Sequence, residues 1–223
     1  PEMSRRIAAG DVAGAHAAQN RAAGFSLALS APFTVAFLTI PGLIMAALFQ
    51  RGAFSAEDSA RAAAVLAAYG FALPAVVLVR SAVASFYARQ DTKTPLWASL
   101  TAIGVNVALK LWLTGPYGVT GLALATAVSQ WVNLLLLLVL AKRRNWTAPG
   151  RTLGLTVAGV LLACLGLAAV AVYGQGLAQA LVPDLPHGRE IVVLAVLGMA
   201  GAAVYGGLLA GLLHLFGLRL RRA

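Results

Sequence analysis

Long apolar runs separated by short polar segments constrain this sequence more than any other feature. A helix needs roughly twenty predominantly apolar residues to cross a bilayer core of about 30 Å. Helix is the conformation expected for each run, because a lone apolar strand would leave its amides unpaired in hydrocarbon. Six segments are long enough, namely residues 25–49, 62–87, 96–113, 119–141, 153–172 and 191–216.

The composition supports the same fold class. Hydrophobic residues make up 60% of the 223 residues and charged residues only 11%, whereas a soluble domain has about 45–50% and about 25%. A water-soluble fold of this size cannot bury so much apolar surface. We therefore predict an all-α polytopic membrane protein, a bundle of six transmembrane helices.

The segments between the spans contain residues typical of turns. The sequence GPYG at 115–118 predicts a tight hairpin, and TAPGR at 147–151 separates the fourth span from the fifth. Residues 174–190 are predicted to form the longest loop between spans, since their two prolines oppose a helix. The first and second spans are predicted to kink or break at three prolines. These prolines are Pro32, Pro41 and Pro74.

The distribution of Lys and Arg predicts the orientation. An even number of spans places both ends on one side, and that side holds twelve of the 17 basic residues, against three on the other. Because Lys and Arg concentrate in cytoplasmic loops, both ends are expected in the cytoplasm. The net charge of +10 then reflects headgroup contacts rather than nucleic-acid binding, since no basic face is interleaved with aromatic residues.

The polar interval SFYARQDTKTPL between the second and third spans is predicted to be a short cytoplasmic turn. Asp91 suits the turn, Thr94 can cap the following helix, and Pro95 fits its first turn. Arg89 and Lys93 are expected to lie at the lipid headgroups.

Enzymatic activity is not expected. His16, His187 and His214 are far apart, no carboxylate lies in the middle of a span, and the common catalytic spacings are absent from the sequence. No metal site and no cofactor are predicted.

Ionisable residues inside spans are costly in lipid and therefore indicate function by default. Arg80 lies within the second span. It either extends to the cytoplasmic headgroups or faces a cavity, where a guanidinium is a natural ligand for phosphate. Lys110 lies one turn after Asn106 on the same face of the third span. Its ammonium either extends to the outer surface or is held by Asn106 and hydroxyl groups of the next helix.

Three polar residues of the fourth span share one helix face, because their spacing is i, i+3 and i+7. They are Thr126, Ser129 and Asn133. Hydrogen bonding between helices is the simpler role for them, and holding the Lys110 ammonium is the alternative.

Three stretches together resemble the MurJ (MviN) family, the lipid II flippases of the multidrug/oligosaccharidyl-lipid/polysaccharide exporter superfamily. They are LFQRGAFSAEDSA at 48–60, LPAVVLVRSAVASFYARQDTKTPL at 73–96 and GVTGLALATAVSQWVNLLLLLVLAKRR at 118–144. The resemblance covers residues 1–145, with two loosely similar helices beyond. It implies a MATE-like transporter of fourteen helices, built from two six-helix lobes and a C-terminal pair.

On this resemblance, residues 1–24 are the cytoplasmic end of a preceding helix plus an interfacial helix. Residues 25–145 are four transmembrane helices of the second lobe, and residues 146–223 are the C-terminal helix pair and a basic tail. The chain opens with PEMSRR and no initiator Met, so we expect an N-terminal lobe of the same protein to be missing. Much of the family's cavity charge comes from that lobe, so these residues alone are expected to be inactive.

The resemblance implies transport of lipid II, an undecaprenyl-pyrophosphate-linked glycopeptide, across the bacterial inner membrane. The lipid would pass from the inner to the outer leaflet by alternating access, for peptidoglycan synthesis. Arg80 matches the family's basic residue in that span, and Arg89 and Lys93 are further candidates for the cavity. The alternatives are a related exporter of polysaccharide-linked lipids or drugs, and a non-transporting membrane scaffold for cell-wall enzymes. Arg80 favours a pyrophosphate lipid over a cationic drug.

Some members of the family bind sodium in the second lobe, through an Asn, an acid one turn later and a Thr on the next helix. Asn106 and Thr126 match this layout, but Lys110 stands where the acid would be. An ammonium repels sodium, so we predict no sodium binding at this place.

Overall fold

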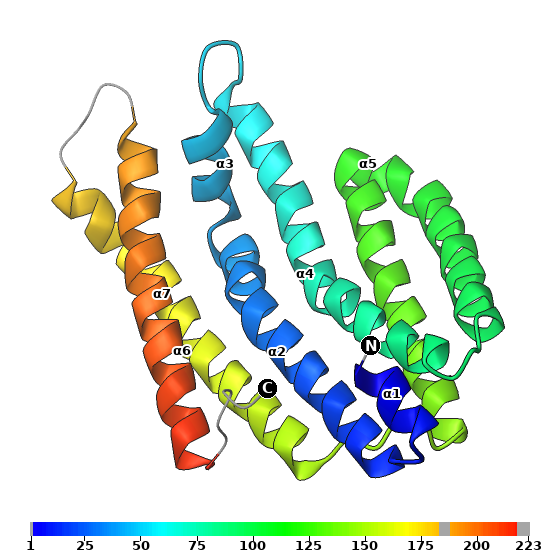
Figure 1. Cartoon of the computed structure of the whole chain (residues 1–223). Coiled ribbons are helices and arrows are strands. Elements are labelled where there is room, and N and C mark those ends of the chain that lie inside the picture. The colour runs from blue at the N-terminus through cyan, green and yellow to red at the C-terminus, as the bar shows by residue number, and fades with distance from the viewer. Residues whose placement is uncertain (1, 183–187, 218–223) are drawn as a thin grey trace. The chain divides into compact units, whose positions relative to one another are not determined.

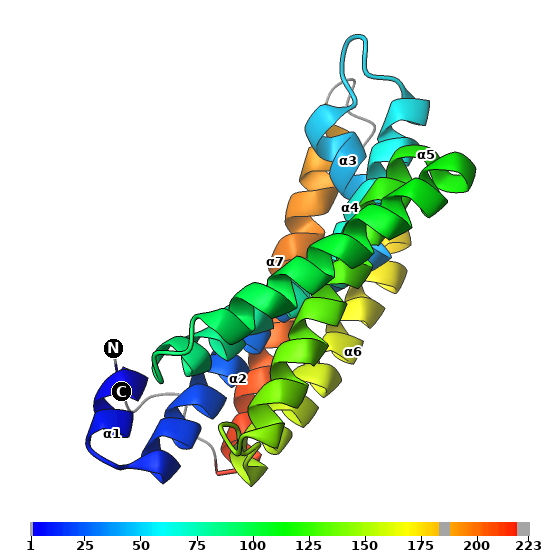
Figure 2. The ribbon, with the colours of Figure 1, turned by 90° about the vertical axis from the view of Figure 1, so that its right-hand side faces the viewer.

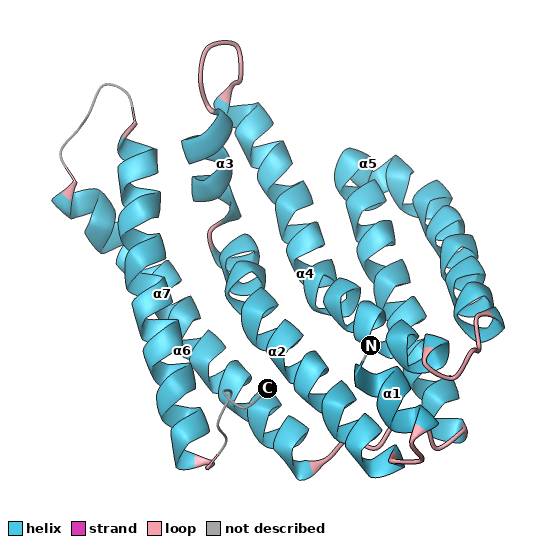
Figure 3. Ribbon diagram, in the orientation of Figure 1, coloured by secondary structure: helices cyan, strands magenta, loops and turns pink. Residues whose placement is uncertain are grey.

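All regular structure in the computed structural model is helical (Figures 1 and 3), in agreement with the predicted fold class. The model describes residues 2–182 and 188–217. Within these residues seven helices follow one another: α1 (Glu2–Ala8), α2 (Val12–Thr39), α3 (Pro41–Phe49), α4 (Ala56–Tyr87), α5 (Lys93–Arg143), α6 (Arg151–Leu181) and α7 (Arg189–Leu215).

Five of these helices, α2, α4, α5, α6 and α7, are long and apolar enough to cross a membrane. The 51-residue α5 contains two of the predicted spans, because its backbone is not helical at Gly118, where φ is 53° and ψ is −132°. Glycine accepts a positive φ without steric strain, so the chain folds back there (Figures 1 and 2). The predicted hairpin is confirmed. Each arm, 93–117 and 119–143, has roughly 25 residues, which is enough to span.

The first predicted span is divided between two helices. Ile40 leaves the helical conformation, with φ −129° and ψ 39°, and Pro41 occupies the first turn of α3. Proline lacks an amide hydrogen and clashes with the preceding turn, so the predicted break occurs at this position. Pro32 and Pro74 instead lie inside α2 and α4, which continue past them.

The first span also begins earlier than the sequence suggests. Helix α2 runs without interruption from Val12, so residues 12–24 are the first turns of a spanning helix. Asp11 caps this helix, because its Oδ1 accepts a hydrogen bond of 2.8 Å from the Gly14 amide. Arg6 donates to Oδ2 of the same carboxylate at 3.1 Å. The Gly14 amide, and to a smaller extent Arg6, lower the pKa of Asp11.

Helix α6 is longer than its predicted span. Residues 174–181, which we predicted to be part of a loop, are helical, and this prediction was wrong. Gly174 is tolerated there because it lies close to α7: a Cβ on it would be only 3.0 Å from Leu197 Cδ2. Small residues allow such close approach between helices. The rest of the predicted loop and tail lies partly outside the described residues, namely Pro183, Pro186, His187, Arg219, Arg221 and Arg222.

The chain divides into two compact units. Unit 1 consists of Pro1–Ser30 and Ala72–Val157. Its core joins α4 to both arms of α5, with Phe86 and Leu137 fully buried among smaller residues. The buried residues of this core are Ala75, Ala82, Phe86, Ala98, Leu134, Leu137 and Ala141.

Unit 2 consists of Ala31–Phe71 and Ala158–Ala223. In it α3 packs against α7, and glycines bring α6 and α7 together. A Cβ on Gly166 would lie 2.4 Å from Leu208 Cδ1, and one on Gly201 would lie 2.6 Å from Leu167 Cδ1. These contacts leave no room for a larger side chain at either position.

Candidate functional site

A cluster of cationic and aromatic side chains lies where the turn after α4 meets the end of α5. The Trp146 ring has the Arg144 guanidinium 4.8 Å from its centroid and the Arg89 guanidinium 5.2 Å away. Phe86 packs edge-on against the same ring at 5.4 Å. A guanidinium over an aromatic face is attracted by the ring quadrupole, so Trp146 joins two cations that would otherwise repel each other.

Arg89 is engaged inside this cluster. Its Nη1 donates to the Ser85 carbonyl at 2.9 Å and to the Ser85 hydroxyl at 3.0 Å. The buried Ser85 hydroxyl in turn donates to the Trp146 carbonyl at 3.4 Å. Burial lowers the pKa of Arg89, but a guanidinium stays protonated in proteins. The structure therefore places Arg89 against its own turn.

Asp91 joins the cluster to the start of α5. Its Oδ1 accepts from the Thr94 amide at 3.0 Å, and its Oδ2 accepts from the Thr94 hydroxyl at 2.7 Å and from Arg144. The two Thr94 bonds, with a smaller effect of Arg144, lower the pKa of Asp91 to about 2. Thr94 was predicted to cap this helix, which was wrong: its hydroxyl donates, and Asp91 supplies the accepting oxygens.

Replacing Asp91 with alanine is expected to destabilise the intact protein by about 2 kcal/mol at neutral pH, since a capping carboxylate and a charged hydrogen bond are lost. The pKa of Asp91 is about 2 in the fold, against an ordinary 3.8. The stabilisation is therefore complete above about pH 3.8 and lost as the pH falls through about 2. Thermal unfolding of both proteins across this range measures it.

Glu57→Gln is the matched control, because Glu57 forms an exposed i, i+4 pair with Arg61, and such pairs contribute little. Equal melting temperatures of the Asp91→Ala variant and the parent at pH 7 would contradict the assigned role.

A second polar cluster joins the two arms of α5. Asn106 Nδ2 donates to the Ser129 hydroxyl at 3.0 Å and to the Thr126 hydroxyl at 3.3 Å. Both hydroxyls donate onward to carbonyl groups of their own helix, Thr126 to Leu122 and Ser129 to Thr126. The interhelical hydrogen bonding predicted for this face is present at these two residues.

The remaining basic residues of interest make no hydrogen bond within either cluster. The half-buried Lys110 ammonium makes no hydrogen bond to any described residue, and neither does the exposed Lys93. Arg80 is exposed on α4, and it shares one helix face with Ala84 and Tyr87, which are exposed as well. This cation inside a spanning helix is not paired to any carboxylate of the described residues.

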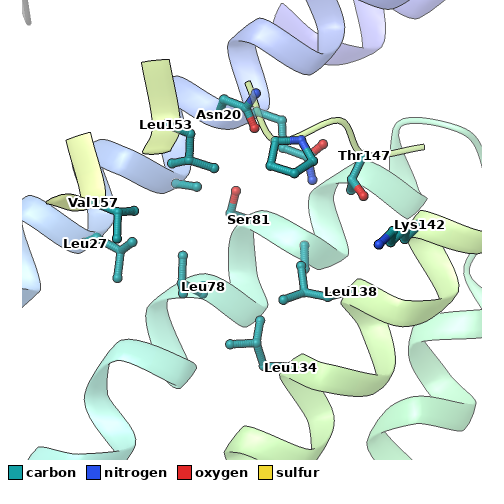
Figure 4. Close-up of a pocket in the computed structure, with 14 residues that line it drawn as sticks. Asn20, Leu27, Leu78, Ser81, Leu134, Leu138, Lys142, Thr147, Leu153 and Val157 are labelled. Atoms are coloured by element: carbon teal, nitrogen blue, oxygen red, sulfur yellow. The ribbon is translucent and has the colours of Figure 1, made fainter. Parts of the chain in front are cut away.

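Unit 1 also contains a cavity of about 440 Å³, which sequence reasoning missed (Figure 4). It lies where the early turns of α2, the last turns of α4 and α5, and the first turns of α6 meet. Its position on α4 is opposite to Arg80, because Leu78, Ser81 and Ala82 line it. The fourteen lining residues are Gln19, Asn20, Ala23, Leu27, Leu78, Ser81, Ala82, Leu134, Leu138, Lys142, Thr147, Pro149, Leu153 and Val157.

The fold and these sites define an all-helical, multi-pass membrane protein with charged and amide side chains inside its spans. The chain is 36% identical to the probable lipid II flippase MurJ of Rhizobium tropici over 167 residues, which are 73% of this chain and 31% of that protein. The probable lipid II flippase MurJ of Rhizobium meliloti (strain 1021) is 39% identical over 66% of this chain and 28% of its own length. The family model described as lipid II flippase MurJ matches residues 1–184, and the chain belongs to this family.

A third relative, the probable lipid II flippase MurJ of Rickettsia prowazekii (strain Madrid E), is 32% identical over 74% of this chain and 32% of its own length. The chain therefore spans about a third of the length of these curated relatives. The family is one of transporters rather than catalysts, in line with the expectation that the chain is not an enzyme.

Proposed function

We propose that the protein to which these residues belong moves lipid II from the inner to the outer leaflet of the bacterial inner membrane by alternating access. Membership of the MurJ family supports the substrate. The excess of Lys and Arg on one side supports a cytoplasmic location of both ends of this chain. Membrane lipids are its expected partners.

Arg80 is the observation that carries the proposal. An arginine inside a spanning helix is costly in lipid, and this one, two turns before the end of α4, is exposed on an apolar helix without a carboxylate partner in the described part of the chain. A planar guanidinium binds phosphate oxygens through two parallel hydrogen bonds. A polar route for a pyrophosphate lipid along this face of α4 would account for both facts.

Arg89 and Lys93 have different roles in this proposal. Arg89 is held by Ser85 and Trp146, so its role is to fix the turn after α4. Lys93 is exposed and makes no hydrogen bond to a described residue, so its ammonium is free to attract an anionic headgroup.

Complementation tests the proposed function. A bacterium is depleted of its own lipid II flippase and given the intact gene that encodes these residues, and the lipid II exposed on the outer leaflet is measured. Restored growth together with restored exposure of lipid II is the expected result. Exporters of other lipids or drugs, and scaffolds without transport, would leave lipid II on the inner leaflet.

We also predict that the position between Asn106 and Thr126 binds no sodium. The Asn106 amide donates to the hydroxyls that a cation would need as ligands, and the basic Lys110 lies one turn away in place of an acid. Crystals soaked in a thallium(I) salt should show no anomalous peak between Asn106 and Thr126. Lys110→Asp is the informative variant, because it restores a carboxylate. A thallium peak in the parent protein would refute the prediction.

A further inference from the structure

The cavity of unit 1 contains a buried polar group that has no partner in the described part of the chain. Gln19 is only 7% exposed, lines the cavity, and its carboxamide makes no hydrogen bond to a described residue. Buried polar groups in native structures are normally satisfied, and leaving one unpaired is costly. A ligand with polar atoms at this position would supply the missing partner.

Other polar groups lie around the same space. The Asn20 Nδ2 donates to the Ala148 carbonyl at 2.8 Å, so its Oδ1 is left as an acceptor. Figure 4 shows the Ser81 hydroxyl and the Lys142 ammonium directed into the cavity. No carboxylate belongs to the lining residues, and Lys142 forms no ion pair with a described acid. The polar part of the ligand should therefore be anionic.

Most lining residues fall in three helical rows, and two of these rows change from a polar residue to apolar residues along the helix. From polar to apolar, one row runs from Gln19 to Ala23 and Leu27 on α2 and another from Lys142 to Leu138 and Leu134 on α5. The third row, Pro149, Leu153 and Val157 at the start of α6, is apolar throughout. Residues four apart lie above one another on a helix. The cavity surface is consequently mostly apolar, and its few polar groups lie at the loop end of these helices.

The α2 and α6 rows lie at matching levels. The bond from Asn20 to Ala148 joins α2 to the segment that precedes α6. One turn further in, a Cβ on Gly24 would be 3.1 Å from Thr156 Cγ2. The loop ends of the two rows therefore lie together, and their inner, apolar ends meet inside the spans. This order of polarity matches a bilayer lipid, whose phosphate lies at the surface above its acyl chain.

We propose that this cavity binds one anionic phospholipid of the cytoplasmic leaflet. Lys142 and the Gln19 carboxamide bind its phosphate, and an acyl chain lies along Leu138, Leu134 and Leu27. A volume of about 440 Å³ is smaller than a whole diacyl phospholipid, so the cavity holds one acyl chain beside the phosphate and the rest of the lipid lies outside it. The lipid stays bound and is not the transported substrate, because Arg80 lies on the opposite face of α4. The inference does not depend on the proposed transport activity.

The test uses the intact protein purified in mild detergent, with phosphatidylglycerol as the probe and phosphatidylcholine as the neutral comparison. Native mass spectrometry counts bound lipids, and thermal unfolding is followed as each lipid is added. We expect one tightly bound phosphatidylglycerol that raises the melting temperature, and weaker binding of phosphatidylcholine. Lys142→Glu should reduce the affinity for phosphatidylglycerol roughly tenfold or more, as loss of a charge-assisted bond would.

Arg143→Glu is the matched control, since Arg143 is exposed, adjacent in sequence and absent from the lining. Equal losses in the two charge variants would show general attraction to headgroups and overturn the site. Gln19→Leu is expected to stabilise the delipidated protein while it weakens phosphatidylglycerol binding, because a buried unpaired amide is removed. Unchanged binding in this variant would also overturn the proposal, as would equal affinity for the two lipids in the parent protein.

Discussion

Replacing Arg80 with alanine in the intact protein is expected to reduce delivery of lipid II to the outer leaflet by about 10- to 100-fold. The estimate follows from the loss of hydrogen bonds between a guanidinium and a pyrophosphate, worth about 1.5–3 kcal/mol. The side chain is exposed on a spanning helix and has no carboxylate partner among the described residues, so the substitution should leave packing unchanged. The measurement is the rate at which lipid II becomes accessible outside cells depleted of their own flippase.

Two further variants separate substrate binding from membrane anchoring. Arg80→Lys keeps the charge but loses the planar pair of donors, so transport should be intermediate. Arg61→Ala is the matched control, because Arg61 lies on the same helix, is exposed and pairs only with Glu57 among the described residues. If Arg80→Ala transported lipid II at the parental rate, Arg80 would be a headgroup anchor, and the proposed route along α4 would be wrong.

The spans were predictable because hydrocarbon imposes helix on any long apolar run, and the hairpin at Gly118 because glycine marks a positive φ. The ends of the spans were not. Residues 12–24, predicted to include an interfacial helix, are continuous with the first span, and residues 174–181, predicted to be loop, are helical, because a helix does not have to stop at the bilayer surface. Of the three prolines in the first two spans, only Pro41 separates two helices, and Ile40 before it leaves the helical conformation.

The contacts within the two polar clusters were not equally predictable from the sequence. The bonds from Asn106 to Thr126 and Ser129 follow from spacing along two arms joined by a short hairpin. The contacts of Trp146 with Phe86 and Arg89 join residues far apart in the chain, and periodicity carries no information about such pairs. The same holds for the cavity, which four helices and a loop enclose. Its one sequence signal was a pair of adjacent amides, Gln19 and Asn20, in an alanine-rich helix.

Replacing Trp146 with alanine is expected to destabilise the intact protein by about 3 kcal/mol, at the lower end of values for removal of a large aromatic side chain. Trp146 is half-buried, packs edge-on against Phe86 and lies beneath two guanidinium groups. Its loss would also leave Arg89 and Arg144 without the ring that separates their charges. The melting temperature should fall accordingly.

Trp112→Ala is the matched control, because Trp112 is 74% exposed and its removal deletes the same side chain without these contacts. A double-mutant cycle with Arg89→Met and Trp146→Leu isolates the cation–π contribution, for which a coupling of about 0.5–1 kcal/mol is expected. If the Trp146 and Trp112 variants melted at the same temperature, the cluster would not hold the turn between α4 and α5. A normal melting temperature combined with lost transport would instead assign Trp146 and Arg89 to the substrate route.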